Sequence, residues 1–349
     1  MRLVVTGATG NVGTSLLSVL AADPAVTAIV GVARREPAWE NPKTSWAKAD
    51  VRIADLDGIF RGADAVVHLA WAIQPSREHE LMRETNVDGS RRVFEAAARV
   101  GVPTLVHASS VGAYSRGPKD STVDESWPTG GIPTSFYSRH KVEVERILDR
   151  VEREHPGLRV VRLRPGLIFK RQAASGIRRL FAGPLLPSPL LRARLIAGVP
   201  SHPRLRVQAV HSLDVADAYR RAVMTPAARG AYNVAADPVL DGAELGRLLG
   251  AHPLPVDARL LRMATAASYK LRLQPTPAGW LDLALGVPLL DSTRARVELG
   301  WEPTRSASDA LLELLDGLRD SAGFPTPPLD ASSGGPLRLR ELLTGVGRS

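Results

Sequence analysis

The 349-residue sequence contains no cysteine, which excludes disulfide bonds and any chemistry that depends on a thiolate. It also lacks an apolar run long enough to cross a bilayer, and an apolar strand pattern begins directly after Met1-Arg2, where a signal peptide would lie. No cluster of histidine and acidic residues has the spacing of metal ligands. These absences predict a cytoplasmic protein without a membrane span, a disulfide bond or a metal ion.

Basic residues outnumber acidic ones, with 45 Lys and Arg against 36 Asp and Glu, which gives a net charge of +9. They are spread along the chain rather than gathered into one tract, so neither nucleic acid nor a membrane is an expected partner. We expect most of them to form a solvated surface and a minority to hold an anionic cofactor. The apolar content of 44% is typical of a soluble globular protein.

A glycine-rich turn follows the first apolar run of the chain. The run Leu3–Val5 is typical of a strand, the turn Thr6–Gly13 reads TGATGNVG, and a helical pattern follows it. This order is typical of a dinucleotide-binding unit, because glycine lets a pyrophosphate approach the backbone and the new helix offers its unpaired N–H groups. Such turns also arise for steric reasons alone, but the position directly after a strand favours a cofactor site. The residues expected to contact the cofactor here are Gly7, Thr9, Gly10, Asn11, Val12 and Gly13.

Strand and helix signals alternate through the first half of the chain, which predicts an α/β fold with a doubly wound parallel sheet of the Rossmann type. We expect the dinucleotide-binding domain over residues 1–165. A smaller, mainly helical substrate lobe is expected over 166–320, with 205–235 returning to the first sheet. Residues 321–349 are rich in proline and glycine and are expected to be poorly ordered.

The end of the second expected strand indicates which dinucleotide binds. Related folds usually place Asp or Glu there to bind the adenosine ribose hydroxyls, but this sequence has Ala33, followed by Arg34 and Arg35. Two guanidinium groups bind a 2′-phosphate that an acid would repel, which predicts NADP rather than NAD. The alternative is that both are ordinary loop arginines. Further cofactor contacts are expected at the ends of the third and fourth strands, from Asp50, Val51, Leu69 and Ala70.

Polar residues also gather after the fifth expected strand, residues 104–108. Ser110 lies just beyond its carboxyl end, where sites in such sheets are found. Tyr137 and Lys141 are four residues apart at the start of an expected helix and therefore share one face. Because that face otherwise packs inward, a lysine on it indicates a specific role.

In their order along the chain, these segments resemble the extended short-chain dehydrogenase/reductases, the group that includes NAD-dependent epimerases and dehydratases. The resemblance covers roughly residues 1–305. It rests on the Thr6–Gly13 turn, Asp50-Val51, His68-Leu69-Ala70, Asn86-Val87-Asp88-Gly89, Ser109-Ser110 with Tyr114, Tyr137-x-x-x-Lys141, Arg164-Pro165-Gly166, His211 with Asp214-Val215-Ala216, and Leu299-Gly300-Trp301-x-Pro303.

The resemblance implies a role for each polar residue of the site. Tyr137 would exchange a proton with the substrate oxygen, and Lys141 would lower the pKa of Tyr137 and hold the nicotinamide ribose. Ser110 would hydrogen-bond the reacting carbonyl or hydroxyl group. Asn86 and Pro165 would lie at the cofactor.

The resemblance also implies a homodimer, formed through the helices expected at Glu78–Val100 and Tyr137–Arg153. The segment Leu167–Arg171 replaces the Tyr-Gly-Pro that is usual in sugar-nucleotide members, and Trp71, Trp127 and Phe169 suit a more apolar small-molecule carbonyl compound. A phosphate-bearing substrate is the alternative that Arg171, Arg178 and Arg179 leave open. We therefore expect an NAD(P)(H)-dependent oxidoreductase. The alternatives are a sugar-nucleotide epimerase or dehydratase that recycles its cofactor, and a non-enzymatic dinucleotide sensor.

Overall fold

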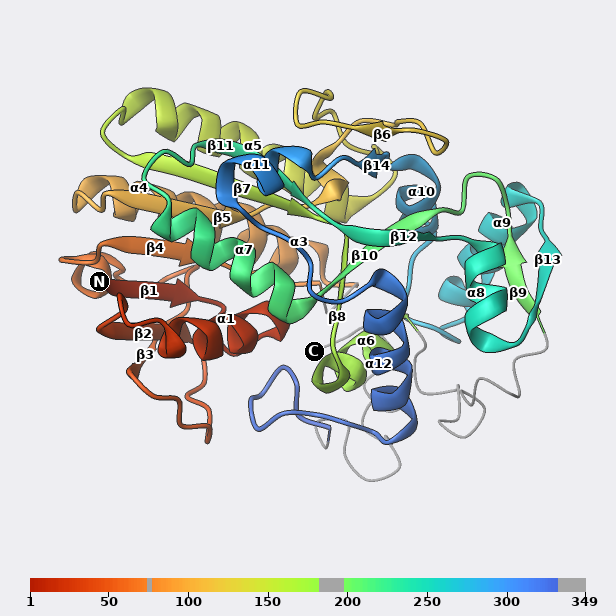
Figure 1. Cartoon of the computed structure of the whole chain (residues 1–349), viewed down its shortest axis with the longest axis horizontal. Helices are drawn as coiled ribbons and strands as arrows, with labels where there is room; N and C mark the ends of the chain where they lie inside the picture. The colour runs from red at the N-terminus through yellow and green to blue at the C-terminus, as the bar shows by residue number, and fades with distance from the viewer. Residues whose placement is uncertain (74–76, 182–197, 332–349) are drawn as a thin grey trace.

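The computed structural model describes residues 1–73, 77–181 and 198–331, and a seven-stranded sheet lies at its centre (Figure 1). The strand order is β11-β7-β5-β4-β1-β2-β3, and every neighbouring pair is parallel. From β1 the chain adds strands first toward one edge and then toward the other, so the predicted doubly wound fold is confirmed. The strands are β1 (Arg2–Thr6), β2 (Ala28–Ala33), β3 (Thr44–Lys48), β4 (Ala65–His68), β5 (Thr104–Ala108), β7 (Arg159–Pro165) and β11 (Gly230–Val234).

Helices cover both faces of this sheet. Successive residues of a strand point to opposite faces, and Val4 and Val5 of β1 accordingly belong to two different buried clusters. The cluster around Val5 is formed with α1 (Asn11–Ala22), α7 (Ser212–Met224) and α11 (Thr293–Leu299). The cluster around Val4 is formed with α2 (Asp57–Phe60), α4 (Gly89–Arg99) and α5 (Phe136–Glu154). Burial on both faces explains why the strands read as continuous apolar runs.

The helix expected over residues 78–100 is interrupted. It consists of α3 (His79–Arg83), a π-helical turn at Glu84–Asp88, and α4. Asn86 lies in the π-helical turn and is fully buried. Single π-helical turns within helices frequently occur at functional sites, because the extra residue redirects a side chain.

Much of the chain after β7, together with β6 from before it, forms short sheets and further helices that are called the second lobe here. The order β12-β10-β8 forms a three-stranded sheet, β13 pairs with β9, and β14 pairs with β6. The strands are β6 (Thr122–Val123), β8 (Leu167–Phe169), β9 (Gly198–Ser201), β10 (Val207–His211), β12 (Ala236–Leu240), β13 (His252–Pro255) and β14 (Leu289–Leu290). The helices are α6 (Ala174–Phe181), α8 (Gly242–Leu249), α9 (Ala258–Lys270), α10 (Gly279–Gly286) and α12 (Ala307–Arg319).

The segment expected to return to the large sheet does so only in part. Strand β11 pairs with β7, and α7 packs into the core of the large sheet. Strand β10, in contrast, lies in the three-stranded sheet. The division of the chain into domains stays a prediction.

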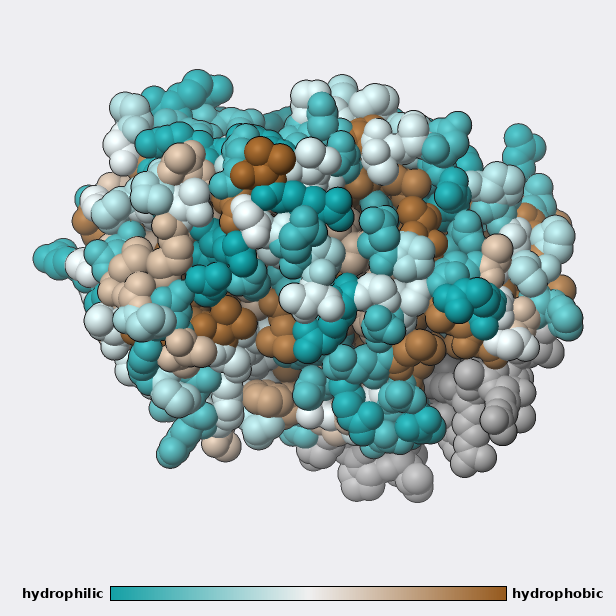
Figure 2. All heavy atoms as spheres, in the orientation of Figure 1, coloured by the Kyte–Doolittle hydropathy of each residue, from teal (hydrophilic) through white to brown (hydrophobic). Residues whose placement is uncertain are grey.

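On the face shown in Figure 2, hydrophilic residues predominate and apolar residues appear in small separate groups.

The first part of the C-terminal segment is packed, contrary to the prediction for residues 321–349. Thr326 is 1% exposed, and its Oγ1 donates a hydrogen bond of 2.8 Å to the carbonyl oxygen of Thr9. The Phe324 ring meets Trp39 edge-on, with 5.0 Å between ring centroids. The prediction is therefore wrong for residues 321–331, because these contacts fix them on the glycine-rich turn. Residues 332–349 lie outside the described part of the chain.

Candidate active site

The glycine-rich turn has the geometry that a phosphate group requires. Gly7 has a φ of +70°, and a Cβ atom there would lie 2.6 Å from the nitrogen of Ala70. A Cβ atom on Gly13 would lie 2.4 Å from the carbonyl oxygen of Gly7, so both glycines serve close packing. At Gly10 a Cβ atom would meet only the Gly7 oxygen, at 3.3 Å. The backbone at Gly10 is thus accessible beside the N-terminus of α1, which fits a dinucleotide pyrophosphate.

Other residues of the turn have structural tasks. The Asn11 side chain donates a hydrogen bond of 3.1 Å to the carbonyl oxygen of Ile168 in β8. The carbonyl oxygen of Thr9 accepts the bond from Thr326. Asn11 therefore ties α1 to the second lobe through its side-chain amide, and only its backbone remains suited to a phosphate. Val12 lies half-buried in the first turn of α1.

At the adenosine end, the two predicted arginines are exposed. Arg34 and Arg35 follow β2 directly, as expected. Asp50 lies beyond β3, which ends at Lys48, and its carboxylate binds the Arg52 guanidinium at 2.8 Å. Hydrogen bonds from Arg52 hold the pKa of Asp50 below its usual value, with a smaller contribution from the charge of Arg34. Arg52 is thus a partner of the Asp50 carboxylate, and the expected contact of Asp50 with the cofactor stays a prediction.

The loop after β4 is held in place from two sides. The Leu69 N–H donates a hydrogen bond of 3.0 Å to the carbonyl oxygen of Thr6. The Asn86 side chain accepts from the Ala72 N–H at 2.6 Å and donates to the Ala72 carbonyl at 2.8 Å. Asn86 therefore positions this loop. Two other predicted residues are buried, namely Val51 against Gly89 and Pro165 at the end of β7 beside β11, and Ala70 is partly buried against Gly7.

The structure brings the three predicted catalytic residues together at the carboxyl end of β5. Ser110 begins a short 3-10 helix, and its Oγ accepts a hydrogen bond of 3.0 Å from the Gly112 N–H. A Cβ atom on Gly112 would lie 2.9 Å from the Tyr137 ring, so glycine is required where α5 meets this turn. Lys141 lies one turn further along α5, and its Nζ donates a hydrogen bond of 2.6 Å to the carbonyl oxygen of Ala108.

Burial shifts the pKa values of two residues of this group. Burial raises the pKa of Tyr137 to about 12, although a hydrogen bond with Ser110 acts in the opposite direction. Burial also lowers the pKa of Lys141 well below its usual value. The predicted lowering of the Tyr137 pKa depends on Lys141 together with a positively charged nicotinamide, and it stays a prediction. The raised pKa of Tyr137 favours the protonated phenol, which is the form that donates a proton.

Two tryptophans flank Tyr137. The Trp280 ring of α10 lies 5.0 Å from the Tyr137 ring between centroids, and Trp71 meets Tyr137 edge-on at 5.9 Å. The Nζ of Lys141 is 3.3 Å from the centroid of the Trp71 ring. Tyr137 and Trp280 also border an apolar cluster formed by Ile132, Leu283 and Val287 with Val111. The surroundings of Tyr137 are thus aromatic and apolar.

Sequence reasoning found only one of these two tryptophans. Trp71 follows β4 directly after a motif segment, whereas Trp280 lies in the other lobe and carries no local signal. Trp127 and Phe169, which were grouped with Trp71, belong to two other apolar clusters. Neither belongs to the apolar cluster that borders Tyr137.

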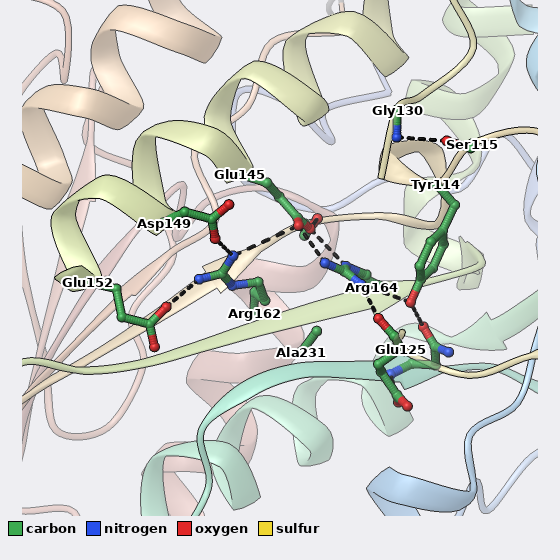
Figure 3. A network of polar contacts seen from close by, with 12 residues as sticks. Tyr114, Ser115, Glu125, Gly130, Glu145, Asp149, Glu152, Arg162, Arg164 and Ala231 are labelled. Atoms are coloured by element: carbon green, nitrogen blue, oxygen red, sulfur yellow. Dashed lines mark hydrogen bonds and ion pairs between the residues drawn. The ribbon is translucent and has the colours of Figure 1, made fainter. Parts of the chain in front are cut away.

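A buried polar network lies beneath α5 (Figure 3). Glu145, one turn beyond Lys141, accepts hydrogen bonds from Ser109 and from Arg164 of β7. Arg164 also donates to the Tyr114 hydroxyl at 3.0 Å. The network therefore links α5 with the end of β5 and with β7, and so fixes where Tyr137 and Lys141 stand relative to Ser110.

The described residues contain no group of three or more His, Asp or Glu side chains that could hold a metal ion. Within the same residues, no helix has both the length and the apolar character needed to cross a membrane.

Comparisons with known proteins agree with this geometry. A family model described as "NAD dependent epimerase/dehydratase family" matches residues 3–235. An uncharacterized protein of Mycobacterium tuberculosis is 28% identical over 326 residues, and the match covers 93% of this chain but 31% of that protein. The chain thus spans less than a third of the length of this relative.

Two further matches cover nearly the whole of both proteins. A UDP-glucose 4-epimerase of Mycolicibacterium smegmatis is 28% identical over 339 residues, which covers 92% of this chain and 100% of the relative. The crystal structure of a UDP-glucuronic acid 4-epimerase from Bacillus cereus, in complex with UDP-glucuronic acid and NAD, superposes with a TM-score of 0.66 at 17% identity. That match covers 92% of this chain and 99% of the other, and shows a shared fold.

Proposed function

The chain belongs to the NAD-dependent epimerase/dehydratase family, and on that premise we propose that it transfers a hydride between NADP(H) and a small-molecule substrate at a carbon that carries a hydroxyl or carbonyl group. The observation that carries this proposal is the meeting of Ser110, Tyr137 and Lys141 at the carboxyl end of β5. A dinucleotide sensor needs no positioned proton donor, which favours an enzyme.

The three residues divide the work at the substrate oxygen. Ser110, which hydrogen-bonds Tyr137, orients that oxygen. In the reducing direction the Tyr137 phenol donates its proton to the oxygen, and in the oxidising direction the phenolate takes it back. When bound, the nicotinamide supplies or accepts the hydride. Lys141, anchored on the Ala108 carbonyl, holds the nicotinamide ribose.

The preference for NADP rests on the charge at the end of β2. Ala33 replaces the acid that binds ribose hydroxyls in NAD-binding relatives of this fold, and Arg34 and Arg35 are exposed beside it. The negative charge of Asp50 is balanced by Arg52. A 2′-phosphate at this place therefore meets a positive surface.

The aromatic and apolar residues around Tyr137 support an apolar carbonyl or alcohol substrate. Trp71 and Trp280 are uncharged aromatic side chains, and both pack against the Tyr137 ring.

A second candidate is a sugar-nucleotide epimerase. It is favoured by the Mycolicibacterium smegmatis UDP-glucose 4-epimerase, which matches this chain over its whole length. Such an enzyme would use Tyr137 twice, once to accept a proton and once to return it, with no net consumption of the dinucleotide.

One set of assays on the purified protein separates the candidates. Consumption of NADPH with members of a panel of aldehydes and ketones supports the reductase. Interconversion of UDP-glucose and UDP-galactose without net change in the cofactor supports the epimerase. If the protein binds the dinucleotide but catalyses neither reaction with either panel, the sensor replaces both.

A further inference from the structure

Helix α9 turns an apolar side toward solvent, at the end of the molecule away from the large sheet (Figure 1). No residue of the helix is buried. Leu260 and Met263 are each 66% exposed, and Leu271, directly after the helix, is 69% exposed. Ala264 and Ala267 are exposed as well. These five residues recur every three or four positions and so form one stripe along the helix, the α9 stripe, of the kind that normally faces a core.

The other side of α9 is polar and is tied to the protein. The Gln274 amide group donates hydrogen bonds of 3.2 Å to the carbonyl oxygen of Thr265 and to the hydroxyl of Ser268. Arg262 forms an ion pair of 2.8 Å with Asp282 of α10. Since these contacts hold the polar side against its neighbours, the fold itself directs the α9 stripe outward.

Large exposed apolar side chains are concentrated in this region. Of the nine that the described part of the chain contains, five lie between Leu254 and Leu273. The other four lie in separate parts of the fold, namely Ile53, Leu167, Val297 and Leu312. Single exposed apolar residues are ordinary on protein surfaces, whereas a contiguous group marks an interaction surface. The α9 stripe therefore indicates a partner.

Basic side chains accompany the stripe. Residues 258–281 contain four basic residues and no acidic one, the four being Arg259, Arg262, Lys270 and Arg272. Two of them lie near the acids that flank this segment, Asp257 and Asp282. Lys270 and Arg272, on either side of Leu271, are exposed and form no ion pair with any described residue. The C-terminal end of α9 is therefore both apolar and positively charged.

We propose that the α9 stripe binds the surface of a bilayer that contains anionic phospholipid, with α9 lying along the interface. The apolar side chains enter the outer acyl region, and Lys270 and Arg272 meet lipid phosphates, as in interfacial amphipathic helices. A second copy of the chain fits less well, because pairing two stripes would bring basic residues together with no acid in 258–281 to accept them. Spread along the sequence, the basic residues alone did not indicate a membrane, and it is the apolar stripe beside them that does.

The test is sedimentation of the full-length protein with vesicles. One set is phosphatidylcholine alone, and the other is phosphatidylcholine mixed equally with phosphatidylglycerol. We expect binding to the anionic vesicles only, weakened by added salt. The double variant Leu260→Ser/Leu271→Ser should lower the affinity by about tenfold or more, because two apolar side chains no longer leave water. Lys270→Gln should lower it by about fivefold, the effect of one basic residue at an anionic membrane.

Two control variants change matched residues away from α9. Val297→Ser removes an exposed apolar side chain of α11, and Arg61→Gln removes an exposed arginine beside α2. Both should bind the anionic vesicles nearly as the wild type does. Unfolding in urea checks that every variant is folded, which is expected because all of these positions are exposed.

Two outcomes would overturn the proposal. If the wild type does not bind the anionic vesicles, no membrane covers the stripe, and a mass in solution that falls in Leu260→Ser/Leu271→Ser would then identify a second copy as the occupant. If the wild type and this double variant bind equally, the net charge of +9 and not the stripe accounts for the binding. None of these measurements uses the catalysed reaction, so the result is independent of the proposed function.

Discussion

Arg164 of β7 and Glu145 of α5 form a bidentate ion pair, with 2.8 Å between Nε and Oε1 and 2.5 Å between Nη2 and Oε2. Their side chains are 6% and 4% exposed. Burial alone would raise the pKa of Glu145, but hydrogen bonds and charge from Arg164 hold it below its usual value. Because Glu145 follows Lys141 by one turn, the pair fixes the catalytic helix on the sheet.

We expect Arg164→Met to destabilise the fold by about 3–5 kcal/mol, because it leaves the Glu145 carboxylate buried without its partner. The free energy of unfolding in urea measures the effect. The control Arg61→Met changes an exposed arginine outside α4 and α5 and should cost less than about 0.5 kcal/mol. Equal stability of the two variants would show that the pair does not hold α5.

Arg34→Ala should weaken NADPH binding by about 1.5–3 kcal/mol, the contribution of a charge-assisted hydrogen bond, and should leave NADH binding nearly unchanged. Fluorescence titration of both dinucleotides measures this difference. Arg153→Ala, at the exposed end of α5, serves as the control. Tighter binding of NADH than of NADPH by the wild type would contradict the assignment of NADP.

Thr326→Val should lower stability by about 0.5–1.5 kcal/mol, because it removes the buried hydrogen bond to the Thr9 carbonyl. Since Thr9 belongs to the glycine-rich turn, we also expect a several-fold loss of dinucleotide affinity. Thermal melts and dinucleotide titrations measure both effects, and Ser321→Ala, on an exposed residue of the same segment, is the matched control. A variant that melts and binds like the wild type would mean that the segment does not support the turn.

The predicted homodimer would pair α4 and α5 of two copies. The outward residues of these helices are charged and include Arg92, Glu95, Arg146 and Arg150, so ion pairs would have to hold this interface. Light scattering at micromolar concentration should give twice the chain mass of 37.4 kDa, and Arg146→Glu should reduce it to one chain. A wild type that elutes with the mass of one chain would refute the dimer.

The parts of the site that the sequence predicts are those set by local structure. The glycine-rich turn, the end of β5 and the spacing of Tyr137 and Lys141 each depend on a few consecutive residues or on one helical turn. The alternation of strands and helices then places these segments at one edge of a parallel sheet. Gly7 accordingly lies just beyond β1, and Ser110 and Lys141 lie at the end of β5, while their roles stay predictions.

The features that sequence reasoning missed depend on contacts between distant segments. Trp280 reaches Tyr137 from the second lobe, and Thr326 reaches Thr9 from the far end of the chain. The raised pKa of Tyr137 follows from burial by such neighbours, which no local pattern reports. Periodicity likewise identified the strand at Val207–His211 but could not show which sheet it joins.

The two partners of Tyr137 should fail in different ways when they are replaced. Lys141→Ala should reduce both the rate and the affinity for the dinucleotide, because Lys141 is proposed to hold the ribose as well as to support the tyrosine. Ser110→Ala should reduce the rate alone, since its hydroxyl orients the substrate oxygen. Steady-state rates and dinucleotide titrations on both variants test this difference, and identical effects of the two changes would contradict the division of roles.

The proton transfer by Tyr137 is tested most directly by the rate of hydride transfer in Tyr137→Phe. This change keeps the ring between Trp71 and Trp280 and deletes only the hydroxyl. With the best substrate from the carbonyl and sugar-nucleotide panels, the rate should fall by about a hundred- to ten-thousand-fold, while dinucleotide affinity stays the same. A Tyr137→Phe enzyme that retains the full rate of the wild type would contradict the proposed mechanism.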